Sequence, residues 1–417
     1  MAITRPQIDA ATEALTRALK LDRPADAVLH DFFREHRGAG ARDRAFIADS
    51  VYGVLRRKRT VDHLAGEDGA RRMLLAYLAR IAGVSVRELA DAMAPAENRW
   101  LAQIRAESVD GLPLAVRLEL PDWLAERLGR TRTEAELLAL ARGLNEPAPL
   151  DLRVNTLVCE RDEARLRLAA DGFEAQPMPY SPVGLRLRGR PSIQHHPLFL
   201  EGAIDVQDEG SQLLGYLVAP RRGELVVDFC AGAGGKTLML GALMRSQGRL
   251  YAFDVSAARL SRMKPRLRRS GLSNLHPQLI ADEHDVRIKR LAGKADRVLV
   301  DAPCSGLGTL RRNPDLKWRQ SPRSLEELQR KQASILRSAA RLVRPGGRLV
   351  YATCSLLAEE NEEIVSGFLS GHPGFRTIDC GSLLSEARIA LDSELFLKLY
   401  PHIHGTDGFF AAVLVRE

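Results

Sequence analysis

The sequence predicts an α/β protein with a doubly wound parallel sheet in its C-terminal half, preceded by a small α+β segment and an N-terminal helical domain. Apolar residues in the first third recur at helical spacing, and the middle segment mixes strand and helix patterns. Beyond it, strands alternate with helices, which is typical of a parallel sheet covered on both faces. At about 150 residues per domain, the 417 residues suffice for two or three domains. We expect domains at 1–145, 146–220 and 221–417.

The first two domains are assigned from short local patterns. In the first, Ile47, Val51 and Val54 stand at the four- and three-residue spacing of an amphipathic helix. Prolines after residue 145 are expected to end the helical domain. In the second, we expect strands at 150–158 and 184–189, a helix at 161–171, and a strand that passes into a helix at 203–218.

The third domain is assigned from its regular alternation of apolar runs and amphipathic stretches. A glycine turn and a helix follow the first apolar run. We expect strands at 224–229, 249–254, 276–282, 295–303 and 348–355, and helices at 256–271 and around 325–342. The last run, 408–416, is expected to be an antiparallel strand at the edge of the sheet.

Charge and cysteine usage restrict the class of protein. The formal net charge of +8 favours an anionic partner such as nucleic acid, although a basic enzyme with no such partner has the same balance. The five cysteines are odd in number and show no C-x-x-C pair, so we expect no metal site and a reducing compartment. Neither a signal segment nor a run of about 18 apolar residues is present, so we expect a cytoplasmic protein without a membrane partner.

The glycine turn after the first strand has the features of a cofactor loop. Gly232, Gly234 and Gly235 allow a tight turn and close approach of the backbone to a ligand, and the helix behind them offers free N–H groups. The following Lys-Thr invites comparison with a nucleoside-triphosphate loop. That pattern requires a glycine five residues before Gly235, where this chain has Cys230. We therefore exclude a triphosphate site.

Acids follow three successive strands of the predicted sheet. Asp254 follows the second strand, where a carboxylate can accept hydrogen bonds from ribose hydroxyls. Asp282 follows the third strand, where it can meet an adenine edge, and Asp301 ends the fourth. Each acid alone is more often a helix cap or a solvated turn residue. Together with the glycine loop they indicate a nucleoside site, which S-adenosylmethionine fits and a dinucleotide fits in part.

Two cysteines stand at matching strand ends. Cys304 follows Asp301 in a Pro-Cys-Ser turn after the fourth strand, and Cys354 lies in a Thr-Cys-Ser turn after the fifth. If these strands are neighbours, about 4.8 Å apart, both thiols lie at one edge of the sheet. A lone cysteine is usually a small buried apolar residue, but two cysteines in matching polar turns favour chemistry.

Methylation at carbon 5 of cytosine explains why two thiols are needed. A thiolate that adds to carbon 6 makes carbon 5 nucleophilic, and a second group must then help remove the carbon 5 proton so that the thiol can leave. Asp301 could hydrogen-bond the pyrimidine edge and support the adduct. Either Cys304 or Cys354 could attack on these grounds alone.

Several stretches resemble the RNA cytosine-C5 methyltransferase family of the Sun/Fmu type, and most closely its bacterial members acting on small-subunit ribosomal RNA. The matching stretches are 150–157, 205–212, 226–237, 298–318, 349–355 with the following 359–361, and 408–414. A weaker resemblance links 43–64 to the helical domain of the antitermination factor NusB. The loop departs from the family pattern Cys-Ala-Ala-Pro-Gly-Gly-Lys, because Gly232 and Ala233 replace Ala and Pro.

The resemblance implies a Rossmann-like methyltransferase fold, S-adenosylmethionine as cofactor and RNA as substrate. It implies that Cys354 is the nucleophile and that Cys304 assists release. The implied cofactor residues are Cys230, Ala231, Gly232, Ala233, Gly234, Gly235, Lys236, Asp254, Asp282 and Asp301. Alternatives are a transfer-RNA cytosine-C5 methyltransferase, an NAD-type oxidoreductase, and a non-catalytic RNA-binding assembly factor.

RNA contacts are expected from cations and an aromatic side chain near the family-like stretches. Phosphates attract cations, and an unpaired base can stack on an aromatic ring. The expected contact residues are Arg153, Asn155, Arg311, Arg312, Lys317 and Trp318. The predicted helix 256–271 carries six cations and no acid, which fits either a solvated basic face or RNA contact.

Overall fold

The chain divides into two units that do not follow each other in sequence. The computed structural model describes residues 3–66, 69–107 and 111–417. The helical unit comprises Met1–Pro147 and Thr309–Pro322, and the large unit comprises Ala148–Gly308 and Arg323–Glu417. The predicted segment 146–220 therefore belongs almost entirely to the same unit as the predicted parallel sheet.

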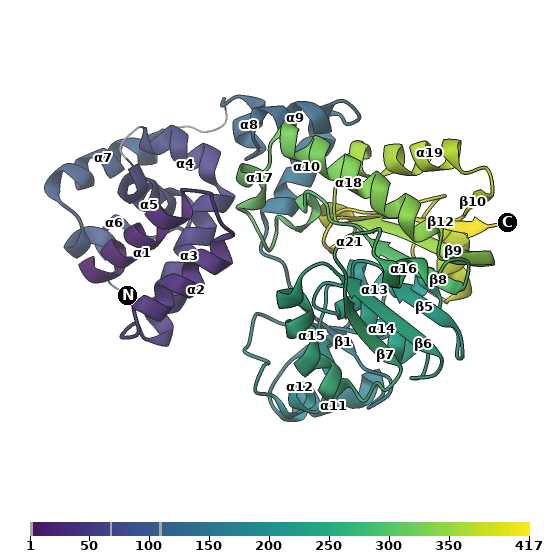
Figure 1. The fold of residues 1–417 in the computed structure, drawn as a ribbon. Helices are drawn as coiled ribbons and strands as arrows, with labels where there is room; N and C mark the ends of the chain where they lie inside the picture. Colours follow the sequence, from purple (N-terminus) through teal and green to yellow (C-terminus); the bar gives the residue numbers. More distant parts are fainter. Residues whose placement is uncertain (1–2, 67–68, 108–110) are drawn as a thin grey trace. The chain divides into compact units, whose positions relative to one another are not determined.

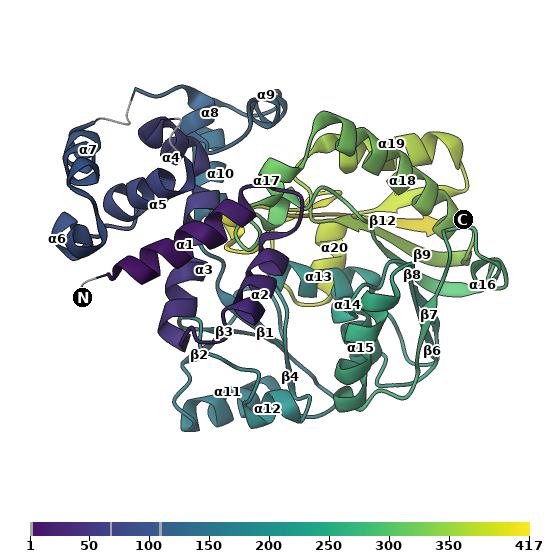
Figure 2. The ribbon, with the colours of Figure 1, turned by 60° about the vertical axis from the view of Figure 1, so that its left-hand side comes forward.

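The helical unit confirms the predicted N-terminal helical region (Figures 1 and 2). In its first helix Ile8, Ala11 and Leu15 recur at three- and four-residue spacing, and all three are fully buried. The helices are α1 (Arg5–Ala18), α2 (Ala25–Glu35), α3 (Ala41–Arg56), α4 (Lys58–Ala65), α5 (Gly69–Arg80), α6 (Val86–Leu89), α7 (Pro95–Ala106), α8 (Leu114–Arg117), α9 (Asp122–Gly129), α10 (Glu134–Asn145) and α17 (Leu316–Arg319).

Helix α17 belongs to this unit, although its sequence lies in the middle of the predicted methyltransferase domain. Trp318 packs against the hydrophobic core that α1, α3 and α5 form. Its indole Nε1 donates a hydrogen bond to the carbonyl oxygen of Leu55, at 2.7 Å. Asp315 accepts a hydrogen bond from the backbone N–H of Ala25, at 3.2 Å. The segment Thr309–Pro322 is thus part of the helical core, which local sequence patterns do not reveal.

The small α+β segment forms its own four-stranded antiparallel sheet in the large unit. The strand order is β2-β3-β1-β4. Leu152, Leu185 and Ile204 of this sheet pack with Leu168 of α11 in a separate hydrophobic core. The elements are β1 (Leu150–Val154), α11 (Arg161–Ala170), β2 (Ala175–Pro177), β3 (Gly184–Leu187), α12 (Pro197–Leu200) and β4 (Ile204–Val206).

The predicted parallel sheet is present as an eight-stranded sheet of order β10-β12-β9-β8-β5-β6-β7, with β11 paired to β12. Pairing is parallel from β9 to β7 and antiparallel at β12. The strands are β5 (Leu225–Asp228), β6 (Arg249–Asp254), β7 (Leu275–Leu279), β8 (Ala295–Asp301), β9 (Val343–Thr353), β10 (Phe375–Ile378), β11 (Leu397–Leu399) and β12 (Phe409–Arg416).

Two expectations about this sheet need correction. The last strand, β12, is antiparallel as predicted but lies between β9 and β10, so its placement at the edge is wrong. The short strand β10 pairs with the outer side of β12 and has no clear strand pattern in the sequence. The Arg-Pro-Gly-Gly stretch at 344–347 lies within β9, where a register shift against β8 between Ala295 and Arg297 absorbs it.

Both faces of the sheet are covered by helices, as the doubly wound class requires. Successive strand residues alternate between faces: Val226 belongs to one core, Val227 to the other. One face carries α13 (Glu209–Val218), α14 (Gly235–Leu243), α15 (Ala257–Ser270) and α20 (Cys380–Glu386), and the other carries α16 (Val286–Lys289), α18 (Pro322–Ala340) and α19 (Glu362–Gly371). Among the described residues, no helix combines the length and the hydrophobicity that a bilayer span requires.

A close helix contact in the helical unit gives a test of the packing. A Cβ atom on Gly53 of α3 would lie 2.0 Å from Cζ of Tyr77 in α5. We expect Gly53→Ala to lower the free energy of unfolding by about 1–3 kcal/mol, because overpacking outweighs the gain in helix propensity. Gly367→Ala in α19 is the matched control. Nothing lies within 4 Å of its added Cβ, so we expect up to ~1 kcal/mol of stabilisation. Equal shifts of the two variants in thermal unfolding would contradict the close packing of Gly53 on Tyr77.

Candidate active site

The carboxyl ends of the parallel strands open onto a cavity of about 670 Å³ in the large unit. This is the edge at which doubly wound sheets bind their ligands, and the volume suits a ligand of nucleoside size. The cavity walls include the glycine loop, Asp254, Asp301, Cys304 and Cys354. The structure thus brings together the loop, two of the three predicted acids and both cysteines.

The glycine loop presents its backbone to this cavity. Residues 230–236 all line it except Gly234. The backbone N–H of Ala231 donates to the carbonyl of Phe253 at 2.8 Å, which ties the loop to β6. Gly232 and Gly234 have φ values of 56° and 86°, in the left-handed region that favours glycine. A Cβ on Gly232 would meet nothing within 4 Å, so the loop leaves open space beside it.

Asp254 lies at the end of β6 with its carboxylate between the loop and the next turn. One oxygen accepts from the backbone N–H of Gly232 at 2.8 Å, and the other accepts from the N–H of Ser256 at 2.7 Å. The side chain is buried yet lines the cavity. Each carboxylate oxygen has a second lone pair, so Asp254 can hold the loop and still accept hydrogen bonds from ligand hydroxyls.

The third predicted acid lies differently. Asp282 is exposed, and its carboxylate accepts from the backbone N–H of His284 at 2.7 Å. It lies outside the cavity lining, whereas the adjacent Glu283 forms part of it. Contact between Asp282 and an adenine edge therefore stays a prediction, and its side-chain position does not favour it.

The two cysteine thiols form a pair. Strands β8 and β9 are neighbours, with Asp301 opposite Ala352, so the turns that follow them lie side by side. The Sγ atoms of Cys304 and Cys354 are 3.4 Å apart. The hydrogen bond between the thiols, and then burial, raise the pKa of Cys304 well above its ordinary value. At neutral pH Cys304 is therefore a thiol and not a thiolate.

Lys236 and Asp301 add an ion pair to the same cavity. The Nζ atom of Lys236 lies 2.6 Å from the Asp301 carboxylate. Burial lowers the pKa of Lys236, but the charge and hydrogen bond of Asp301 outweigh it, so the pKa is raised. Lys236 is thus an ammonium ion that occupies one Asp301 oxygen.

Arg153 and Asn155, which were expected to contact RNA, make hydrogen bonds inside the protein. Both are buried. Arg153 donates its Nε to Oε1 of Gln207 at 2.7 Å, and Asn155 donates to the carbonyl oxygens of Gly202 and Ser270 at 3.0 and 2.9 Å. Direct RNA contact by these residues therefore stays a prediction that their burial does not favour, and Asn155 links the small sheet to α15 through Ser270.

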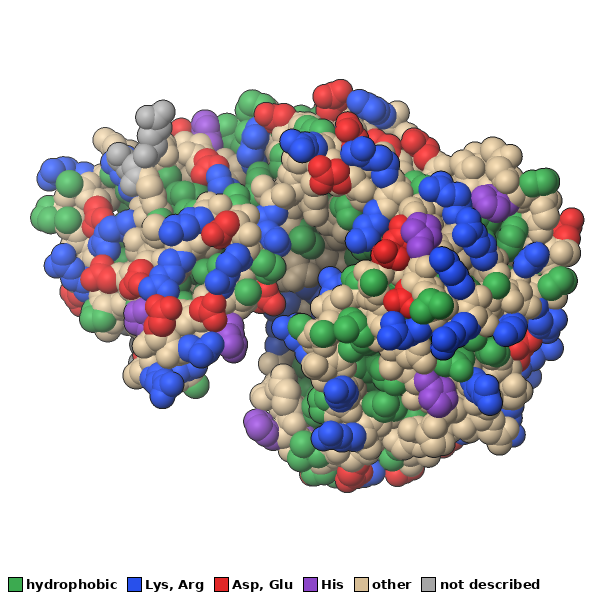
Figure 3. All heavy atoms as spheres, viewed as in Figure 1, with side chains coloured by type: hydrophobic (Ala, Val, Ile, Leu, Met, Phe, Trp, Pro, Cys, Tyr) green, Lys and Arg blue, Asp and Glu red, His purple; other side chains and the backbone are tan. Residues whose placement is uncertain are grey.

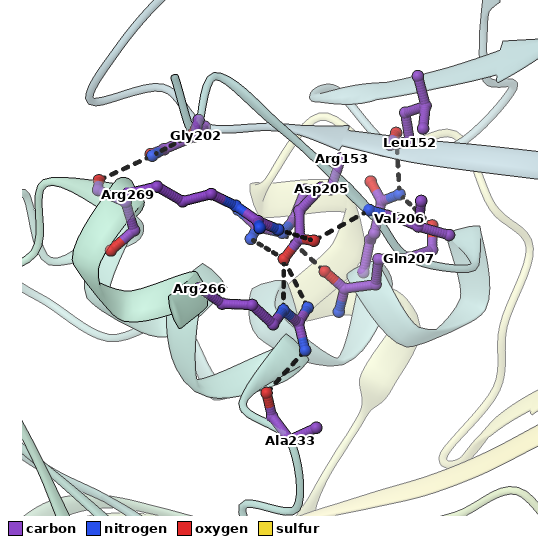
Figure 4. A network of polar contacts seen from close by, with 12 residues as sticks. Leu152, Arg153, Gly202, Asp205, Val206, Gln207, Ala233, Arg266 and Arg269 are labelled. Carbon is purple, nitrogen blue, oxygen red and sulfur yellow. Dashed lines mark hydrogen bonds and ion pairs between the residues drawn. The ribbon is translucent and has the colours of Figure 1, made fainter. Parts of the chain in front are cut away.

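Figure 4 shows the network around Arg153, in which Asp205 of the small sheet faces two arginines of α15. Arg266 binds the Asp205 carboxylate through Nε at 3.1 Å and Nη2 at 2.5 Å. Its Nη1 donates to the carbonyl oxygen of Ala233 at 2.7 Å. Arg269 also reaches Asp205, at 3.3 Å. The loop position where the family pattern has proline is therefore held by an arginine hydrogen bond.

Lys317 is buried in the helical unit, against expectation. Its Nζ donates to the carbonyl of Arg56 at 2.9 Å and to Oδ1 of Asn145 at 3.0 Å. Burial lowers its pKa to about 7. The side chain is only 1% exposed, so Lys317 joins helices, and its position does not favour contact with phosphate.

The other RNA-binding residues predicted in this segment are Arg311, Arg312 and Trp318, and they differ in exposure. Arg311 is buried, and its carbonyl oxygen accepts from Nη2 of Arg56 at 2.9 Å. Trp318 is partly buried and packs against the helical core. Arg312 is partly exposed. Of these three, Arg312 and Trp318 both keep some exposed surface, so RNA contact by them stays a prediction.

Several cavity residues carried little or no signal in the sequence. Gln207 and Ser211 come from the stretch 205–212, which matched the family pattern without indicating that it reaches the cofactor cavity. Glu283 stands beside the acid that was predicted, and Lys331 lies on the amphipathic helix α18, where a solvated lysine is ordinary. Only the tertiary arrangement shows that these side chains share a cavity.

Comparison with known proteins agrees with this geometry. The 16S rRNA methyltransferase RsmB/F family matches residues 215–415, and the RsmF/B-like, ferredoxin-like domain matches residues 120–194. Ribosomal RNA small subunit methyltransferase B of Shewanella oneidensis is 33% identical over 407 residues, which cover 91% of this chain and 92% of that protein.

Two solved structures share the fold. The crystal structure of PH0851 has a TM-score of 0.83 and 29% identity, and the match covers 100% of both chains. NSun6 from Pyrococcus horikoshii, determined with SFG, has a TM-score of 0.63 and 23% identity, covering 71% of this chain and 98% of that one. With its relative in Shewanella oneidensis matched over nearly its whole length, the chain belongs to the RsmB/F family of S-adenosylmethionine-dependent ribosomal RNA methyltransferases.

Proposed function

We propose that this chain methylates carbon 5 of a cytosine in small-subunit ribosomal RNA through a covalent adduct, with Cys354 as nucleophile and Cys304 assisting release. The observation that carries the proposal is the thiol pair, 3.4 Å apart on the wall of the cofactor cavity. A methyl transfer to an amino nitrogen requires no thiol, whereas transfer to carbon 5 uses one sulfur to attack and a second group to complete elimination.

The cavity residues fit S-adenosylmethionine. Asp254 lines the cavity and is the residue we propose for the ribose hydroxyls, and the backbone of residues 230–236 borders open space at Gly232. The fold neighbour NSun6 was determined with SFG, an S-adenosylmethionine analogue. When bound, S-adenosylmethionine supplies an electrophilic methyl group. The protein supplies its cradle and the groups that activate the base.

The protein's own residues then account for the remaining steps. Cys354 gives its proton to solvent, and the resulting thiolate bonds to carbon 6, which makes carbon 5 nucleophilic. After methylation, the carbon 5 proton must leave, and the carbon–sulfur bond to Cys354 breaks. Cys304 lies in contact with Cys354. Because Cys304 is a thiol at neutral pH, it first gives its own proton to solvent; its thiolate then takes the carbon 5 proton, and Cys354 leaves as a thiolate. The Asp301–Lys236 pair lines the same cavity, where Asp301 can meet the pyrimidine edge.

The basic face of α15 is the surface we propose for RNA. Arg266 and Arg269 turn inward to Asp205, but Arg262, Lys264 and Arg268 are exposed. On the face of the molecule shown in Figure 3, Lys and Arg side chains are spread over the large unit and acidic side chains are sparser. Cations attract the phosphate backbone without regard to sequence, so this helix would position RNA and not select the cytosine.

The cofactor assignment can be tested at Asp254. We expect Asp254→Ala to weaken S-adenosylmethionine binding by about 1–3 kcal/mol, because the ligand hydroxyls lose their hydrogen bonds to the charged carboxylate. Titration calorimetry on the full chain measures this. Asp296→Asn serves as control, since Asp296 binds Arg344 and the N–H of Leu225 near the amino end of β5. An unchanged affinity in Asp254→Ala would contradict the assignment.

The roles of the two cysteines can be separated by trapping the adduct. If Cys354 attacks, Cys304→Ala enzyme should form a covalent complex with substrate RNA that persists in denaturing electrophoresis, because elimination is impaired. Cys354→Ala and the double variant should form none and should not methylate. The reverse pattern would exchange the two roles. Methylation without any adduct in all variants would reject covalent catalysis.

The RNA surface can be tested by salt dependence. We expect the double substitution Arg262→Ala and Lys264→Ala to weaken RNA binding and to lower the slope of log K against log salt by about 0.9 for each phosphate that the variant no longer neutralises. Arg376→Ala is the control, because Arg376 lies in β10 at the far edge of the sheet. If both proteins have the wild-type slope, the basic face of α15 is only solvated.

A further inference from the structure

One buried carboxylate joins the two turns that carry the cysteines. Glu360 is fully buried at the end of the short helix η3 (Ala358–Glu360). Its Oε1 accepts from the backbone N–H of Ser305 at 2.8 Å and from Nε2 of Gln332 at 2.9 Å. Its Oε2 accepts from the hydroxyls of Ser305 and Ser355, each at 2.5 Å. Four donors thus converge on one side chain.

Three of these four donors belong to the residues that directly follow the cysteines. Ser305 follows Cys304, and Ser355 follows Cys354. We propose that Glu360 is a positioning residue that clamps the two turns together and thereby holds the two thiols as a pair. Gln332 of α18 supports the clamp, since its Nε2 also donates to the carbonyl oxygen of Pro303 at 3.0 Å.

The chemistry of the clamp requires a carboxylate. Two oxygens with two lone pairs each can accept four hydrogen bonds, which no neutral side chain of that size can do. A buried charge is costly unless it is fully hydrogen-bonded, and charge-assisted bonds are stronger than neutral ones. The negative charge also contributes to the raised pKa of Cys304, after the thiol hydrogen bond and burial. Removing this carboxylate should loosen the spacing of the pair.

The consequence for turnover rests on the proposed function, whereas the consequence for thiol spacing does not. A displacement of about 1 Å at a reacting group can cost about 100-fold in rate. Loosening the turns should therefore lower kcat more than it raises the KM for S-adenosylmethionine, because Glu360 is not part of the cofactor cavity lining.

Phenylarsine oxide measures the spacing independently of methylation. Its arsenic bonds to two thiols that lie side by side and releases one water, without any redox step. The full-length wild-type protein should bind it through Cys304 and Cys354, leaving Cys230 open to alkylation in peptide mapping. Cys304→Ala and Cys354→Ala should lose this bridging. We expect Glu360→Ala, and Ser305→Ala combined with Ser355→Ala, to bind at least about tenfold more weakly.

A matched substitution separates clamping from general loosening. Asp296→Asn removes a carboxylate that binds Arg344 and a backbone N–H away from the thiols, and it should keep wild-type arsenical affinity. Glu360→Gln keeps the shape but not the charge and should lie between Glu360→Ala and wild type. Wild-type affinity in both Glu360 variants, or an equal loss in Asp296→Asn, would overturn the proposal. The arsenical binding results can be as expected while neither wild type nor any variant methylates cytosine. In that case the clamp is supported and the proposed function is rejected.

Discussion

The parallel pairing of β8 with β9 determines where the chemistry of this protein can occur. Because Asp301 lies opposite Ala352, the Pro-Cys-Ser and Thr-Cys-Ser turns leave the sheet at the same edge. A slip of one residue would turn every side chain of one strand to the opposite face. Alternate burial of strand residues on the two faces resists that slip, since Leu299 and Val300 belong to different hydrophobic cores.

The fold of the large unit and much of its site could be predicted from sequence because they depend on local patterns. Apolar runs that alternate with amphipathic stretches predict a parallel sheet, and strand ends predict a common edge. The glycine loop, Asp254 and the two cysteines follow from this rule directly. The position of β12 did not, because the short strand β10 that covers it has no distinct pattern.

The residues that were expected at an RNA-facing surface but are buried share one cause. Arg153, Asn155 and Lys317 are polar, and polarity alone predicts exposure. Their burial depends on partners distant in sequence, such as Ser270 for Asn155 and Asn145 for Lys317. A buried polar group is stable only when such partners are present, and the local sequence does not indicate which partners they are. The same holds for Glu360, whose donors come from three separate segments.

The excursion of Thr309–Pro322 into the helical unit affects how the chain is made. Domains generally fold as units during synthesis, beginning with the N-terminal one. Here the first helices leave the ribosome long before Lys317 and Trp318, which supply hydrogen bonds to the carbonyl oxygens of Arg56 and Leu55. The core of the helical unit is therefore complete only after strand β8 and the turn that follows it have been translated. Completion of the N-terminal core thus comes late in biosynthesis, after Cys304 has been translated and before Cys354.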